Sequence, residues 1–76
     1  MKSKAVLVFS TTHMTLKAEE ILKNGKIPNM VIPKPEGAKS KCGMALSIYE
    51  DDLKRARKLL KNKTITHFAV LSENKT

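Results

Sequence analysis

The sequence predicts an α+β domain whose six elements follow one another as strand, helix, strand, strand, helix, strand. Short apolar runs bounded by turn residues alternate with two segments of helical apolar spacing, and 76 residues suit a single domain. This order is the split βαβ or ferredoxin-like pattern, a two-layer sandwich of a four-stranded antiparallel sheet with two helices on one face. We treat residues 1–76 as one domain with a structured core over about residues 4–72.

The first half of the chain supplies three elements. Residues 4–10 form a continuous apolar run rich in Val, which fits a strand buried on both faces. Hydroxyl residues at 10–12 suit a helix cap, apolar residues then recur with helical spacing from Met14 to Leu22, and Gly25 ends the predicted helix. Residues 29–33 are short, apolar and bounded by two prolines, which is typical of an edge strand.

The second half supplies the other three elements. Residues 34–41 show no apolar periodicity and form a loop longer than a hairpin requires, and such loops often carry function. Residues 43–49 show the alternation of side chains that is typical of a strand and form the third strand. Three acidic residues at 50–52 lie where a helix over about residues 52–62 begins, and they favour the helix dipole. Residues 64–72 form the fourth strand.

This topology predicts where the candidate functional residues meet. The first and third strands pair at the centre of the sheet, and the second and fourth lie outside them. The end of the first strand, the start of the first helix, the long loop and the start of the last strand then share one end of the sheet. We therefore expect residues 10–13, Cys42 and His67 to lie near one another.

Composition restricts the environment of the chain. Cys42 is the single cysteine, so no internal disulfide forms, and the chain is expected to be cytoplasmic. Aromatic residues make up only 4% of the sequence, which predicts a thin core. A thin core without disulfides favours self-association as a homodimer. No apolar run is long enough for a signal peptide or a membrane span.

The charge is strongly positive, with 15 Lys and Arg against 7 Asp and Glu and a net charge of +8. The excess is spread along the chain and is densest on the second predicted helix and just beyond it, at Lys54, Arg55, Arg57, Lys58, Lys61 and Lys63. Lys predominates, whereas base-specific recognition favours Arg, and the predicted sheet lacks aromatic residues for stacking bases. Nucleic-acid binding is therefore less favoured than a solvated helix face.

Cys42 allows three interpretations from the residues alone. It is a buried structural cysteine, a reactive thiol, or a metal ligand together with His13 and His67. The reactive-thiol interpretation rests on the nearby helix N-terminus and lysines, which stabilise a thiolate. In this interpretation His13 orients or deprotonates the thiol, although a His in the first turn of a helix is more often a solvated surface residue, and Gly43 lets a partner approach the backbone. The metal interpretation is weak, because no two of the three ligands are closely spaced.

Three segments resemble one protein family. FSTTH at residues 9–13, IPKP at residues 32–35 and SKCGMAL at residues 40–46 are similar to the selenium/sulfur carrier-like family of small bacterial proteins. The resemblance covers roughly residues 5–70 and implies that Cys42 carries sulfur or selenium as a persulfide or selenosulfide. The chain also departs from the family, which commonly has Arg where this sequence has Glu36.

The resemblance implies a carrier in a relay between a donor and an acceptor protein rather than an enzyme that turns over a free substrate. The carrier thiol is Cys42, with no resident cofactor and no metal. The residues expected to bind the substrate or an anion are Ser10, Thr11, Thr12, His13, Ser40 and Gly43. If the missing Arg binds an anionic donor, Lys34, Lys39 or Lys41 is expected to replace it.

Two other classes of function remain open. The first is a non-catalytic ferredoxin-like module that dimerises through its sheet and regulates or binds a small anion at residues 10–13. Its activity would survive replacement of Cys42 by Ser. The second is a nucleic-acid-binding domain that uses the lysines of the second helix, whose affinity would fall steeply with salt.

Overall fold

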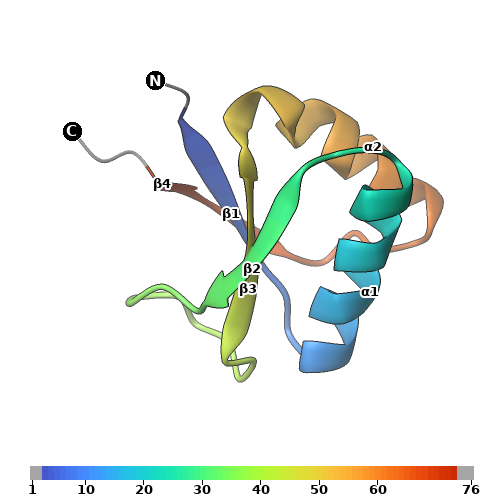
Figure 1. The fold of residues 1–76 in the computed structure, drawn as a ribbon. Coiled ribbons are helices and arrows are strands. Elements are labelled where there is room, and N and C mark those ends of the chain that lie inside the picture. Colours follow the sequence, from blue (N-terminus) through green and yellow to red (C-terminus); the bar gives the residue numbers. More distant parts are fainter. Residues whose placement is uncertain (1–2, 74–76) are drawn as a thin grey trace.

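The computed structural model describes residues 3–73 and confirms the α+β ferredoxin-like fold. The elements occur in the predicted order (Figure 1). Their bounds are β1 Lys4–Val8, α1 Thr12–Asn24, β2 Asn29–Pro33, β3 Met44–Tyr49, α2 Leu53–Asn62 and β4 Ala69–Glu73, with a short 3₁₀ helix, η1, at Glu50–Asp52. No helix within residues 3–73 is long and apolar enough to cross a lipid bilayer.

The sheet has the strand order β2-β3-β1-β4, and every neighbouring pair is antiparallel. β1 and β3 therefore form the predicted central pair, and Leu46 of β3 lies in register with both Leu7 and Val31. Figure 1 shows α1 and α2 on one face of the sheet and the connection between β2 and β3 on the other side. We call this connection, residues 34–43, the β2–β3 loop.

The sheet is packed on both faces. Ala5 and Leu7 face the helices, where the main core includes Phe9, Ala18, Leu22, Ile27, Leu46, Ile48, Ala56, Leu60 and Ile65. Val6 and Val8 alternate onto the opposite face, where they form a second cluster with Ala45. Ala38 of the β2–β3 loop packs against that cluster. The loop thus covers part of the face without helices, which explains why β1 is buried on both sides.

Both helices end in the same way. Gly25 follows α1 as predicted but has an ordinary φ of −84°, and Lys26 takes the left-handed conformation with φ 61°. After α2, Thr64 does the same with φ 62°. In each case the next residue is a buried isoleucine, Ile27 or Ile65, whose amide donates to a carbonyl in the last turn of the helix. This is the hydrophobic helix stop of a Schellman type.

The fourth strand begins later than predicted. β4 starts at Ala69, whereas the sequence predicted a strand from residue 64. Because Thr64 belongs to the helix stop, the residues after it cross the end of the sheet before pairing with β1. Phe68 packs its ring on Phe9 during this crossing, with ring centroids 5.1 Å apart. The other predicted strand boundaries, and the start of α2, agree with the structure within two residues.

Candidate functional site

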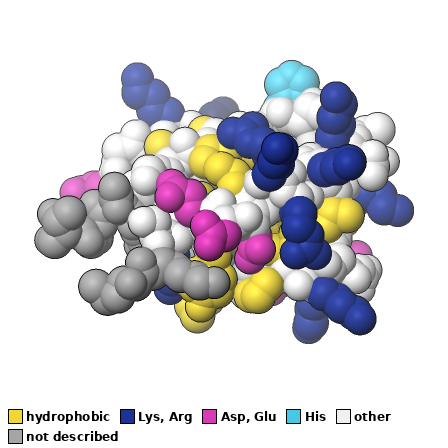
Figure 2. Space-filling model, turned by 90° about the horizontal axis from the view of Figure 1, so that it is seen from above, with side chains coloured by type: hydrophobic (Ala, Val, Ile, Leu, Met, Phe, Trp, Pro, Cys, Tyr) yellow, Lys and Arg dark blue, Asp and Glu magenta, His cyan; other side chains and the backbone are white. Residues whose placement is uncertain are grey.

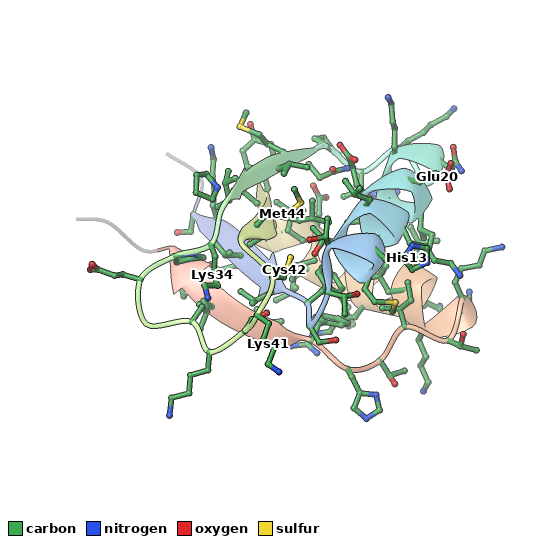
Figure 3. The ribbon with its side chains drawn as sticks, turned by 90° about the horizontal axis from the view of Figure 1, so that it is seen from below. His13, Glu20, Lys34, Lys41, Cys42 and Met44 are labelled. Carbon is green, nitrogen blue, oxygen red and sulfur yellow. The ribbon has the colours of Figure 1, made fainter. Side chains whose placement is uncertain are left out.

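Cys42 lies at the end of the β2–β3 loop, and its side chain faces the first turn of α1 (Figure 3). Its Sγ is 3.3 Å from Thr15 Oγ1 and 3.7 Å from Thr12 Oγ1. These two threonines are three residues apart and share one face of α1. The thiol also donates to the Met44 carbonyl oxygen at 3.3 Å. A single sulfur atom therefore contacts two hydroxyl groups and the beginning of a central strand.

Ser40 attaches the β2–β3 loop to the end of the sheet that holds Cys42. Its hydroxyl donates to the Phe9 carbonyl at 2.6 Å and accepts from the Cys42 amide at 3.1 Å. The Lys34 ammonium donates to the Ser40 carbonyl, and the Lys34 amide donates to the Gly43 carbonyl at 3.0 Å. These bonds join both ends of the loop and hold Cys42 in place.

The Cys42 thiol is buried, with 2% of the residue exposed. Burial raises the pKa of the Cys42 thiol, but the hydroxyl of Thr15, the backbone of Met44, the hydroxyl of Thr12 and the charge of Lys34 lower it. The net result is a pKa below the ordinary value for cysteine. A buried cysteine whose pKa is lowered by hydroxyl groups of the first turn of α1 differs from an inert core cysteine.

The hydroxyls of Thr11 and Thr15, before and in the first turn of α1, form hydrogen bonds with the backbone of the same turn. Thr11 caps the helix, and its Oγ1 accepts from the Met14 amide at 3.1 Å. Thr15 is completely buried, and its hydroxyl donates to the Thr11 carbonyl at 3.0 Å. Within residues 3–73, every buried side-chain nitrogen or oxygen has a hydrogen-bond partner. The Thr11 hydroxyl is thus used as a helix cap.

His13 is not brought to the thiol. It is exposed and lies on the side of α1 away from Cys42 (Figure 3), where it lines a shallow hollow with Leu16, Lys17 and Glu20. Helical geometry accounts for this position, because His13 is nine residues from buried Leu22 and so about 180° away around the helix. The structure therefore offers His13 no contact through which it would deprotonate Cys42.

The remaining predicted residues surround the site at the surface. Ser10, Ser40 and His67 line a groove of about 530 Å³ between the β2–β3 loop and the start of β4. Gly43 is exposed, and nothing lies within 4 Å of the position that a Cβ atom would take there. Among residues 3–73, no three His, Cys, Asp or Glu side chains group as metal ligands would.

From the sequence, Thr15 had no assigned role and Lys34 was indicated only as a replacement for the missing Arg, yet both side chains act on Cys42. Thr15 is a polar residue within the stripe that Ala18 and Leu22 continue, at spacings of three and four residues. A hydroxyl on the buried face of a helix indicates that it has a polar partner inside the protein. Lys34 carried no such signal, because its approach to Ser40 depends on the fold of an aperiodic loop.

Exposed cations occupy the surface outside the site. Lys39 and Lys41 are exposed on the β2–β3 loop, and Arg57 of α2 lies over the Phe68 ring, 5.9 Å from its centroid. Phe68 also lines the groove that includes Lys41, so basic side chains extend from α2 toward the loop. Figure 2 shows Lys and Arg side chains spread across one face of the molecule.

A buried cysteine with a lowered pKa, at the end of a loop in a ferredoxin-like domain, defines a small thiol protein. Residues 4–72 match the family described as "Putative Se/S carrier protein-like", and the chain belongs to that family. The match covers nearly the whole chain, including every strand and helix except the last residue of β4. The chain matches no curated protein and no solved structure at a significant level.

Proposed function

We propose that this protein carries sulfur or selenium on Cys42 as a persulfide or selenosulfide and passes it to a partner protein. The observation that carries the proposal is the Cys42 sulfur itself, which lies within hydrogen-bond distance of the Thr15 hydroxyl and whose pKa is lowered. Membership of the carrier-like family and the presence of a single cysteine add support. A carrier needs a nucleophilic thiolate and no large cavity.

The loading step conserves atoms and electrons. The Cys42 thiolate attacks the outer sulfur of a persulfide on a donor protein and forms a new S–S bond. The S–S bond of the donor breaks, and its inner sulfur leaves as a thiolate while the outer sulfur keeps its proton. The same exchange with a selenium atom in the outer position gives a selenosulfide. A second exchange with an acceptor thiolate regenerates the Cys42 thiolate.

Loading requires that the β2–β3 loop uncover Cys42, because only 2% of this residue is exposed. Ser40 holds the loop through hydrogen bonds to the Phe9 carbonyl and the Cys42 amide. Opening therefore breaks these hydrogen bonds and the packing of Ala38 on the second cluster. A donor that displaces the loop meets the exposed ammonium groups of Lys39 and Lys41, so partners with acidic surfaces are favoured.

Glu36 is exposed on the same loop, where the family commonly has Arg. Lys34 supplies a positive charge in this chain, since its field lowers the pKa of Cys42. Its ammonium is already bonded to the Ser40 carbonyl, so we assign it to holding the loop and the thiolate. We assign contact with an anionic donor to Lys39 and Lys41.

The proposal is tested by the pH dependence of Cys42 alkylation and by intact mass after incubation with a cysteine desulfurase and cysteine. We expect a midpoint below about 8.5, the ordinary pKa of a cysteine thiol, and a stable gain of one sulfur atom. The Cys42→Ser variant is the control and should gain no mass. A wild-type protein that stays unmodified, with loading verified on a known acceptor, would overturn the proposal.

Burial of Cys42 favours one competing function, a non-catalytic binding module in which the thiol is structural. In that case the Cys42→Ser protein retains its binding activity and the sulfur transfer is absent. The exposed apolar residues Met30 and Tyr49, which are 62% and 38% exposed, would then mark the sheet face through which it dimerises. Retention of binding by the Cys42→Ser protein separates this function from the carrier, and size-exclusion chromatography with light scattering of wild-type and Met30→Lys proteins tests the dimer face.

A further inference from the structure

Thr15 is the buried polar side chain closest to the carrier sulfur. The residue is completely buried, and its Oγ1 lies 3.3 Å from Cys42 Sγ and 3.0 Å from the Thr11 carbonyl oxygen. Thr12, in contrast, is exposed, and its hydroxyl is farther from the sulfur at 3.7 Å. Thr15 therefore links the thiol directly to the backbone of the first turn of α1.

The hydroxyl of Thr15 has one proton and two partners. Because it donates to the Thr11 carbonyl, its oxygen faces the sulfur as an acceptor, and the one S–H proton of Cys42 is shared between this oxygen and the Met44 carbonyl. This arrangement suits only the neutral thiol. Once Cys42 has lost its proton, the sulfur and the Thr15 oxygen would face each other as two acceptors unless the hydroxyl turns.

Turning the hydroxyl leaves no backbone group without a partner. The Thr11 carbonyl also accepts from the Thr15 amide at 3.1 Å, so it keeps a hydrogen bond when the hydroxyl leaves. A bond from the hydroxyl to a thiolate is charge-assisted and stronger than the neutral bond that it replaces. The exchange therefore favours the thiolate at little cost to the helix.

We propose that the Thr15 hydroxyl is a positioning group with two states, donating to the Thr11 carbonyl while Cys42 is a thiol and to Cys42 Sγ when it is a thiolate. This inference rests on the proposed function in that it concerns the same thiol. After loading, Cys42 Sγ is bonded to the carried atom and has no charge, so the hydroxyl returns to the Thr11 carbonyl. Thr15 thus stabilises the empty, nucleophilic carrier more than the loaded one.

The other groups near the Cys42 sulfur do not exchange one hydrogen-bond partner for another when the thiol ionises. Lys34 acts through its charge, and Met44 contributes backbone that is held in β3. The Thr12 hydroxyl adds a weaker contact from the exposed end of the same helix face. Removal of the Thr15 hydroxyl should therefore have a larger effect than removal of the Thr12 hydroxyl.

The test is a titration of Cys42 by the ultraviolet absorbance of its thiolate in wild-type, Thr15→Val, Thr15→Ser and Thr12→Val proteins. Val matches the shape of Thr without its hydroxyl. We expect Thr15→Val to raise the midpoint by about one pH unit, the size of one hydrogen bond to a charged group. Thr15→Ser should titrate close to wild type, and Thr12→Val should shift the midpoint by less than half as much as Thr15→Val.

Circular dichroism confirms that each variant is folded before it is titrated. If Thr15→Val does not fold, Thr15→Ala replaces it in the comparison with Thr15→Ser. A Thr15→Val midpoint equal to wild type, or a Thr15→Ser midpoint as high as that of Thr15→Val, overturns the inference. The carrier function fails separately, when wild-type Cys42 gains no sulfur although the predicted midpoints are observed.

Discussion

Lys34 combines an electrostatic effect on Cys42 with a hydrogen bond to the Ser40 carbonyl. At the scale of the residue, Lys34→Met should raise the pKa of Cys42 by a few tenths of a unit, because a nearby cation favours the thiolate. The change is measured as the midpoint of alkylation against pH. Lys39→Met is the matched control, since it removes the same charge from an exposed position on the same loop. Equal shifts in both variants would show that net charge, rather than the position of Lys34, is responsible.

At the scale of the element, the β2–β3 loop depends on Ser40, whose hydroxyl joins the Phe9 carbonyl and the Cys42 amide. Ser40→Ala should destabilise the protein by about 1 kcal/mol and speed native-state alkylation of Cys42 several-fold, because the loop then opens more often. The rate is measured at a pH above the thiol pKa, so that ionisation does not limit it. Ser72→Ala, an exposed serine on β4, should change neither quantity. An alkylation rate in Ser40→Ala that matches wild type would mean that the loop is held by other contacts.

At the scale of the whole molecule, the lowered pKa of Cys42 links folding to pH. The folded state binds the thiol proton less tightly than the unfolded state, in which the pKa is about 8.5. The contribution of Cys42 to stability is therefore complete above about pH 8.5 and is lost as the pH falls through the folded pKa. The free energy of unfolding of wild type minus that of Cys42→Ser, from urea titrations, should rise as the pH increases from the folded pKa to about 8.5 and then level off. The subtraction cancels the contributions of the titratable groups that both proteins share. A difference in unfolding free energy that falls with rising pH would contradict the lowered pKa.

The predictable part of the fold came from patterns that act over short distances along the chain. The continuous apolar run that forms β1 and the proline-bounded segment of β2 were recognisable because strand formation follows local hydrophobicity and turn residues. The start of β4 was misplaced because Thr64, a residue that normally suits a strand, takes a positive φ to end α2. The outward position of His13 follows from helical geometry, because His13 is nine residues from buried Leu22 and so lies on the opposite side of the helix.

By itself, the sequence determined the order of the elements, the antiparallel topology and the end of the sheet at which Cys42 meets the first turn of α1. These follow from periodicity, helix caps and the short connections of a small domain. Only the tertiary structure decided that Cys42 is buried, that Thr15 contacts it and that Lys34 acts on it. The physical reason is that the β2–β3 loop has no periodicity of its own. Its conformation is set by contacts between residues about thirty positions apart, such as the hydrogen bond from Ser40 to Phe9.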